Sequence, residues 1–300
     1  MYSEAAKKEI SVKGRVFTTA RLRYEWSEYL EDPVGMIQAL RQGPTIADLF
    51  TFVTEVFDDH PDYSFPKEPE CLSVLTIKDY ESWWNGIGFK VRNKIRKPAK
   101  CGVELRMVQL DDDFVKGVDD IYNESPVRQN RKFVHYRQGL AITRKELHAF
   151  SDRAYLVGAY HGAELIGFMK LLRTKNVLRT VHIIAKLAHR EIPVMDALIA
   201  KGVELCDQNK IKHLLYGSWT DGGLGDFRLK HGFVRVEVPR YFVPLNQRGR
   251  LMLRLSLHRP LRERLPKSWV EFFKGLRARW NSFRQPSDLD PKRETTEASV

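Results

Sequence analysis

The fold is decided by a stretch that begins YLVGAYHGAELIGFM at Tyr155 and ends KHGF at Phe233. Residues 155–160 and 164–169 within it are apolar and rich in side chains that favour strands. Between these two runs stands His161-Gly162, a turn dipeptide, so the runs predict a β-hairpin. We expect the rest of the architecture to be arranged around this hairpin.

The order of elements after the hairpin narrows the fold further. A strand is expected across 177–187, and Pro193 suits the first turn of a helix that ends near Asn209. Another strand at 212–217 and a short helix before Lys230-His231-Gly232-Phe233 complete the series. A hairpin followed by a strand, a long helix and a strand predicts a mixed sheet with a crossover helix.

Three pieces of this stretch resemble the GNAT acyltransferase superfamily. They are the hairpin segment HGAELIGF (161–168), the helix after the next strand, and FRLKHGF (227–233). Upstream, FKVRNKIRK (89–97) followed by GVELR (102–106) is similar to the FemAB-like branch, in which an N-terminal half precedes the acyltransferase half. The motifs are short, so their order carries the resemblance, which covers roughly residues 80 to 245.

The chain length and composition agree with this architecture. A hydrophobic content of 43% is ample for a packed core in a chain of 300 residues. We expect an α/β fold with an α+β mixed sheet, in four parts. These are an N-terminal α+β half at 1–101, a GNAT-like domain at 102–245, a basic amphipathic helical extension at 246–284, and a disordered tail at 285–300. One interpretation of the N-terminal half is that it is a reduced copy of the GNAT-like fold.

Local patterns predict three further helical features. Residues 46–53, IADLFTFV, read as a helical patch. Residues 79–100 predict one helix, because apolar side chains recur every four residues from Trp83 to Ile95. Thr143 followed by Glu146 has the spacing of a capping box, which predicts that a helix begins there.

The net charge of +12 is concentrated in two segments. Residues 246–284 hold eleven Lys/Arg and two acids, and residues 89–100 hold six Lys/Arg and no acid. Such surfaces attract RNA, anionic lipid or phosphorylated cofactors, and a solvated helix face is the alternative. Within the first segment, aromatic residues from Trp269 to Phe283 form a helical stripe. This stripe predicts peripheral membrane contact through 267–284 or, alternatively, docking on the protein's own core.

The cysteines and the N-terminal residues indicate a compartment. Cys71, Cys101 and Cys206 are far apart and form no CxxC pair, so neither a zinc site nor a disulfide framework is expected. The first residues lack the apolar segment of a secretory signal, and no run of eighteen apolar residues occurs. We therefore expect a cytoplasmic protein. A second hypothesis adds association with the inner face of the membrane.

The resemblance implies a donor site at the start of the crossover helix. GNAT enzymes hold a cofactor pyrophosphate there on backbone N–H groups, in the pattern Arg/Gln-x-x-Gly-x-Gly/Ala. The equivalent stretch, Leu187 to Val194, has no glycine. FemAB-like relatives instead use an aminoacyl-tRNA, so both acyl-CoA and aminoacyl-tRNA stay open as donors. Lys186, His189 and Arg190 are the candidate cofactor-binding residues, with an ordinary surface loop as the alternative.

The resemblance also implies where a proton-transfer group should lie. Many GNAT enzymes use a Tyr on the last short helix as the general acid, and here that position is Arg228. Tyr216 and His182 are catalytic candidates by location, as is Tyr241. For each of these three residues, a structural role within the sheet is the alternative.

Two segments are candidates for substrate binding. The loop 125–137 packs arginines, a histidine and aromatic residues together, in a connection that lies over the acceptor site in the resembled fold. Arginines suit carboxylate or phosphate groups and histidine titrates near neutrality. Trp219, in a glycine-rich stretch after a strand, suits stacking on a sugar-like group. The substrate-binding candidates are Arg128, Arg131, Tyr136, Trp219 and Arg228, and His135 joins the catalytic candidates.

The sequence therefore predicts an acyltransferase. It would move an acyl or aminoacyl group directly onto an amine, without a metal, and the resemblance implies acceptors such as small molecules or glycan precursors of the bacterial cell envelope or surface polysaccharide. One alternative is a catalytically degenerate GNAT-fold binding protein. Another is a peripheral membrane or RNA-binding module that acts through the basic segments.

Overall fold

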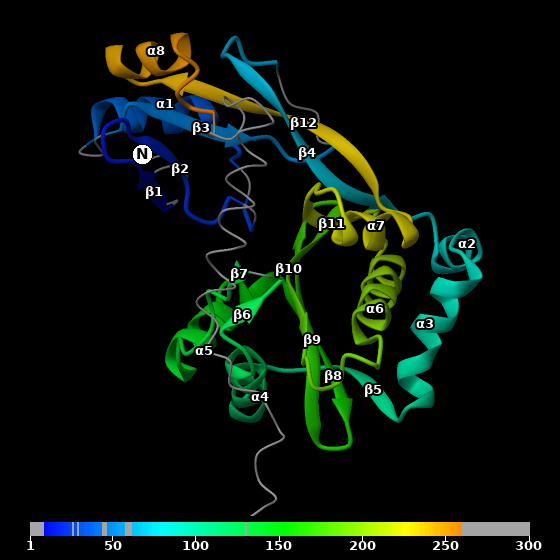
Figure 1. Ribbon diagram of the computed structural model, residues 1–300. Coiled ribbons are helices and arrows are strands. Elements are labelled where there is room, and N and C mark those ends of the chain that lie inside the picture. Colours follow the sequence, from blue (N-terminus) through cyan, green and yellow to red (C-terminus); the bar gives the residue numbers. More distant parts are fainter. Residues whose placement is uncertain are drawn as a thin grey trace, which may run out of the picture.

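A computed structural model describes residues 9–259 of the chain, apart from 26, 29, 44–46, 58–61 and 130 (Figure 1). Its main feature is a ten-stranded mixed sheet in the order β1-β2-β3-β12-β4-β11-β10-β9-β8-β5. The strands of this sheet are β1 (Ile10–Lys13), β2 (Thr19–Leu22), β3 (Leu49–Val53), β4 (Lys67–Thr76), β5 (Val103–Met107), β8 (Ala154–His161), β9 (Glu164–Thr174), β10 (Val177–Ala185), β11 (His213–Ser218) and β12 (Val234–Pro244).

Helices cover this sheet, and two short strands stand apart from it. The helices are α1 (Pro33–Gln42), α2 (Tyr80–Gly86), α3 (Phe89–Lys100), α4 (Asp112–Asn123), α5 (Leu140–His148), α6 (Val194–Gln208), α7 (Gly223–Lys230) and α8 (Gln247–Arg254). A 3₁₀ turn, Ser151–Arg153, precedes β8, and the separate ladder consists of β6 (Val127–Arg128) and β7 (Arg131–Lys132). Among the described residues, no helix is long and apolar enough to cross a membrane.

The predicted hairpin forms the centre of the second half of the sheet. β8 and β9 pair antiparallel from Ala154–Leu172 to His161–Glu164, and Gly162 takes the left-handed conformation that the turn needs (φ +61°). β10 extends this hairpin antiparallel to β9, and β5 adds to β8. The predicted hairpin and the strand after it are therefore confirmed.

The crossover helix α6 covers one face of these strands. It is apolar along most of its length and buries ten residues, among them Leu198, Ile199 and Val203. It approaches β9 closely because Gly167 has no side chain, and a Cβ placed there would lie 2.8 Å from Cγ1 of Val194. α4 and α5 cover the opposite face, so the strands β8 to β10 lie between two helical layers (Figure 1).

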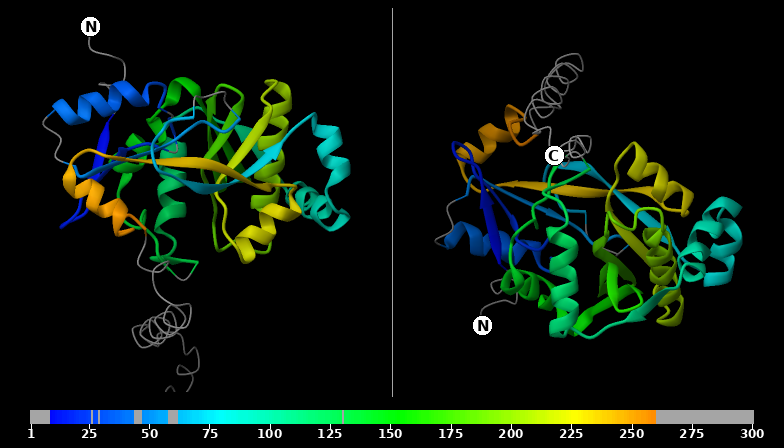
Figure 2. Two further views of the ribbon diagram at one scale, coloured as in Figure 1. Left: turned by 90° about the horizontal axis from the view of Figure 1, so that it is seen from above. Right: turned by 60° about the horizontal axis from the view of Figure 1, so that its bottom comes forward.

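The N-terminal half joins the same sheet. β4 pairs antiparallel with both β11 and β12. A strand of the N-terminal half (67–76) therefore lies between two strands of the C-terminal half (213–218 and 234–244). β12 is long enough to pair with β3 as well. α3 packs on α6, and α8 lies at the end of the molecule that carries α1, away from α2 and α3 (Figure 2).

Three local predictions differ from the structure. Residues 49–53 form strand β3 instead of a helix, because this run of Leu, Phe, Thr and Val pairs with β12. The expected single helix at 79–100 is two helices, broken at Ile87 and Gly88. α5 begins at Leu140 instead of Thr143, whose buried hydroxyl donates to Asp119 Oδ1.

The predicted helical extension is described only in part. α8 and the turns up to residue 259 belong to it, and α8 carries three of its arginines. The aromatic stripe, the proposed membrane segment 267–284 and the predicted disordered tail at 285–300 lie outside the described residues.

Candidate active site

The sheet opens between its two central parallel strands. β10 and β11 have three registered pairs, from Val177–His213 to Arg179–Leu215. Directly after this point β10 has a β-bulge between Thr180 and His182. The extra residue, Val181, shifts the alternation of side chains, so that His182 and Ile184 both face the layer of α4 and α5. The bulge therefore aims His182 at a cavity on that side.

This cavity has a volume of about 1000 Å³ and lies between the two halves of the chain. Three of its lining residues, Arg23, Tyr24 and Ser27, follow β2 in the N-terminal half. The other walls come from α5 and from the middle of β9 and β10, with His135 at the end of the preceding loop. Its lining residues from these elements include Glu146, His148, Phe150, Lys170, Leu172, Val181 and His182. A space of this size is ample for a small-molecule substrate.

His135 is held in a defined orientation at this cavity. Its Nδ1 lies 2.9 Å from Oε1 of Gln138 and 3.3 Å from a carboxylate oxygen of Glu146. The Gln138 amide donates to Glu146 at 3.0 Å and to the Thr143 hydroxyl at 3.1 Å, which turns its oxygen towards the imidazole. Because both neighbours of Nδ1 are acceptors, they favour the neutral tautomer with the proton on Nδ1, in which Nε2 is the acceptor.

His182 stands next to His135 and has a different electrostatic environment. The Tyr122 hydroxyl lies 3.1 Å from Nδ1 of His182, and the Tyr122 ring stacks on both imidazoles. Burial, with smaller contributions from His135, Lys170 and Arg128, lowers the pKa of His182 to about 3. Burial also raises the pKa of the Tyr122 hydroxyl. His182 is therefore neutral at physiological pH and serves as a hydrogen-bonding group in the wall of the cavity.

Lys170 projects from β9 into the same wall. Its ammonium donates to the carbonyl oxygens of Glu146, Leu147 and Ala149, at 2.7, 2.9 and 2.6 Å. These carbonyls belong to the last turn of α5 and the residue after it, where a cation is favourable. Burial lowers the pKa of Lys170 to about 8, although Glu146 raises it. Lys170 thus fixes the end of the helix that carries Glu146.

The cavity is richer in cations than in acids. Arg23, Arg144, Lys145 and Lys170 line it, whereas Glu146 is the one acid among its lining residues from the described part of the chain. Arg23 and Arg144 also pair with Glu9 and Asp112 outside the cavity. This balance favours a ligand with an anionic group.

The structure brings together two of the predicted catalytic residues and separates the third. His135 and His182 have ring centroids 5.0 Å apart. Tyr216 lies in the core cluster on the α6 side, and burial raises its pKa to about 12. Tyr241, which is also a catalytic candidate by its location, packs among aromatic rings of the N-terminal half, and its hydroxyl donates to Asp62. The catalytic candidates therefore occupy three different parts of the molecule.

The predicted substrate-binding residues are dispersed. Arg228 is buried over the Tyr216 ring and donates to Ser73 Oγ and the carbonyl of Ser218. Trp219 is half-buried, and its indole donates to Asp221. Arg131 is exposed on β7, and the ring of Tyr136 contacts the Arg137 guanidinium. The Arg128 side chain is mostly buried, and its guanidinium donates to the carbonyls of Ile121 and Ala185 and to the Glu124 carboxylate.

The predicted cofactor-binding residues flank the loop between β10 and α6. Lys186 and His189 both contact the Glu164 carboxylate, at 2.7 and 3.2 Å. Arg190 is exposed, and its backbone N–H donates to the carbonyl of Leu187. Among the described residues, no cluster of three or more His, Cys, Asp or Glu side chains is placed to hold a metal ion.

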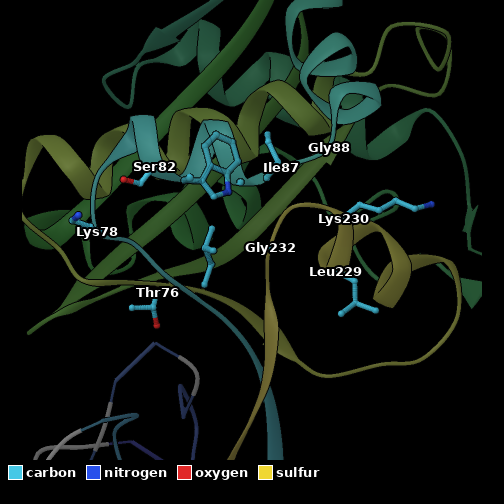
Figure 3. Close-up of a pocket in the computed structure, with 11 residues that line it drawn as sticks. Thr76, Lys78, Ser82, Ile87, Gly88, Leu229, Lys230 and Gly232 are labelled. Atoms are coloured by element: carbon cyan, nitrogen blue, oxygen red, sulfur yellow. The ribbon is translucent and has the colours of Figure 1, made fainter.

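A second, smaller cavity of about 480 Å³ lies between α2 and α7. Ser82, Ile87 and Gly88 lie on one side of it, and Leu229 and Lys230 lie on the other (Figure 3). Trp83 also lines this cavity, and its indole donates to the carbonyl of His231 at 2.8 Å. Sequence reasoning did not identify this cavity.

Sequence reasoning also missed the residues that orient the site. The sequence pattern places Glu146 in a capping box, yet its carboxylate contacts His135. Lys170 carried a usable signal, because it is an isolated cation within the apolar run of β9. Tyr122 carried no such signal, since its position on α4 is an ordinary buried one.

Comparison with known proteins extends this description. No family model matches the sequence, and no curated protein matches it at the significance threshold. Solved structures do match. FemX aligns with 10% sequence identity and a TM-score of 0.56, over 80% of this chain and 85% of its own. L-PGS from Bacillus licheniformis aligns with 12% identity and a TM-score of 0.55, over 82% and 83% of the two chains.

A third match is the C-terminal domain of a protein described as a lysylphosphatidylglycerol synthetase from Agrobacterium fabrum. It has 13% identity and a TM-score of 0.51, over 84% of this chain and 86% of its own. At such low identities, these likenesses show the fold alone. The fold is the GNAT-like acyltransferase fold that the sequence predicts, similar to that of the FemAB-like branch.

Proposed function

We propose that this protein transfers an acyl or aminoacyl group to an amine acceptor that binds in the 1000 Å³ cavity beside His135. The observation that carries the proposal is the orientation of His135 by Gln138 and Glu146, which leaves Nε2 as a proton acceptor. Likeness of fold to FemX and L-PGS supports the same reaction class.

The proposed reaction needs a general base at the acceptor amine. His135 Nε2 takes a proton from the acceptor ammonium, and the free amine attacks the acyl carbonyl of the donor. The bond between the acyl carbon and its leaving group then breaks, the proton on His135 passes to that leaving group, and the nitrogen of the new amide releases its second proton to solvent. Glu146 stabilises the imidazolium that forms between these two steps, as a carboxylate does in a catalytic triad.

The cations of the cavity suggest the acceptor class. Arg23 and Lys145 would attract an amine that also carries a phosphate or carboxylate, whereas the ammonium of Lys170 is already bonded to three carbonyls. Phosphorylated amino sugars and other glycan precursors of the cell envelope fit this description. We therefore propose a cytoplasmic transferase of envelope or surface-polysaccharide biosynthesis, with either acyl-CoA or aminoacyl-tRNA as the donor.

A pair of histidine variants tests this proposal. Acetyl-CoA and a mixture of aminoacyl-tRNAs would be offered with phosphorylated amino sugars, and N-acylated products detected by mass spectrometry. His135→Gln should lower turnover by about 10² to 10⁴ because the base is lost, and thermal unfolding of the same variant establishes that it is still folded. His161→Gln, on the exposed hairpin turn, is the matched control. Full turnover by His135→Gln would exclude this mechanism.

RNA binding through α3 is a second candidate function. α3 buries Val91 and Pro98, whereas its six Lys/Arg side chains are exposed or half-buried. Phe89, in its first turn, is 65% exposed. Cations interleaved with an exposed aromatic ring suit a nucleic-acid backbone and its bases. Affinity for RNA should then fall steeply with salt and should drop when Lys90, Lys94 and Lys97 become Ala. Salt-independent binding would count against this candidate.

A further inference from the structure

The loop between β10 and α6 holds a carboxylate from another part of the chain. Glu124, at the end of α4, accepts hydrogen bonds from the backbone N–H groups of Leu187 at 2.6 Å and Ala188 at 2.7 Å. A different carboxylate oxygen receives each bond. The Glu124 side chain is only 19% exposed, so the contact is an internal one.

Arg128 fixes this carboxylate in place. Its guanidinium donates to Glu124 at 2.9 Å and to the carbonyls of Ile121 and Ala185, at 2.9 and 2.8 Å. Ala185 is the last residue of β10, so one arginine ties α4, the carboxylate and the start of the loop together. A fixed guanidinium beside two convergent N–H groups is a typical setting for a bound anion.

The remaining parts of the loop offer little else to an incoming anion. Pro193 has no N–H group, and Glu164 already contacts the side chains of Lys186 and His189. Several further backbone N–H groups of this segment donate to carbonyls of the chain itself: those of Lys186, Arg190, Ile192, Val194 and Asp196. The donors and cations that a phosphate would use are therefore largely engaged by the protein.

We infer that Glu124 is a specificity-determining residue, a built-in anion that occupies the loop before α6 and excludes a pyrophosphate-bearing donor from it. A phosphate cannot approach the N–H groups of Leu187 and Ala188 without displacing the carboxylate, and the two negative charges repel each other. This inference rests on the proposed transferase function and narrows its donor. The donor that fits is one that brings no pyrophosphate to this loop.

Anion binding tests the inference separately from catalysis. Isothermal titration would measure the affinity of coenzyme A and of inorganic pyrophosphate for the wild type and for Glu124→Ala. Removal of the carboxylate frees two backbone N–H groups and one donor of the Arg128 guanidinium, whose bonds to Ile121 and Ala185 remain, so Glu124→Ala should bind both probes at least about tenfold more tightly. Glu191→Ala is the matched control, because it removes an exposed acid from the same loop and frees no backbone donor.

Two results would overturn the inference. One is tight binding of coenzyme A by the wild type, competed by pyrophosphate, which would leave the transferase proposal itself intact. The other is a folded Glu124→Ala variant that binds pyrophosphate no more tightly than Glu191→Ala does. Thermal unfolding establishes whether Glu124→Ala is folded, and Glu124→Gln, which keeps the size of the side chain, replaces it in the same titrations if it is not.

Discussion

Arg179 and Glu55 form an ion pair in which the two side chains are only 6% and 2% exposed. Arg179 is the last residue of β10 that pairs with β11, and Glu55 follows β3 in the N-terminal half. The ion pair therefore joins the two halves of the chain at the point where the central strands separate. Thr174 Oγ1 accepts a further hydrogen bond from Arg179 Nε at 3.2 Å.

Loss of one partner of this ion pair should be costly. We expect Arg179→Met to lower the free energy of unfolding by about 3–5 kcal/mol, because it leaves the Glu55 carboxylate buried without its cation. The double variant Arg179→Met/Glu55→Leu should recover much of this loss, since no buried charge then remains. Urea denaturation measures both variants, and a double variant as unstable as the single one would contradict this account.

His182 should make the protein sensitive to acid. Its pKa in the folded state is about 3, below the ordinary value of 6.5, so the unfolded chain takes up a proton first as the pH falls. The stability that this histidine contributes is therefore lost as the pH falls below 6.5, by up to about 1.4 kcal/mol per pH unit. His182→Gln lacks this titration. Urea midpoints measured between about pH 7 and about pH 4.5 should fall less for the variant than for the wild type.

Lys170 should make the stability of the protein depend on pH under alkaline conditions. Its folded-state pKa of about 8 lies below the ordinary 10.5, so between these values the unfolded chain holds a proton that the folded chain has lost. The wild type should therefore gain stability relative to Lys170→Met as the pH rises through this window, by about 1.4 kcal/mol for each unit of pKa difference. A stability difference that stays constant across the window would show that the lysine does not titrate there.

Gly167 should be intolerant of a side chain. A Cβ at this position would lie 2.8 Å from Cγ1 of Val194 and 3.1 Å from the carbonyl oxygen of Ile184. We expect Gly167→Ala to destabilise the protein by about 1–3 kcal/mol, because α6 must move away from the sheet. Gly86→Ala is the control, since a Cβ there meets nothing within 4 Å. Equal melting temperatures for the two variants would contradict the close approach of α6.

Much of the second half of the fold could be predicted because its signals are local. Two continuous apolar runs on either side of His161-Gly162 specify the hairpin, and one apolar stretch after Pro193 specifies α6. Residues 49–53 could not be assigned in this way, because a short apolar run fits a helix or a strand equally well. Its pairing with β12, almost two hundred residues later, decides the outcome.

The candidate site was predictable in its residue types and not in its geometry. The sequence indicated His135 and His182 separately, but only the bulge at Val181 and the position of α4 bring the two rings within 5.0 Å. The roles of Glu146 and Glu124 depend on specific tertiary contacts, with Gln138 eight residues away in one case and with the loop after β10 in the other. Such contacts leave no periodic signal in a sequence.

The position of β4 has a consequence for how the chain reaches its native state. β4 is complete at residue 76, yet both of its neighbours, β11 and β12, come from residues 213–244. During synthesis, this strand must wait with unpaired edges until almost the whole described chain has left the ribosome. Contacts so distant in sequence favour slow folding and expose the nascent chain to aggregation, so we expect recovery of active protein to depend strongly on chaperones and temperature.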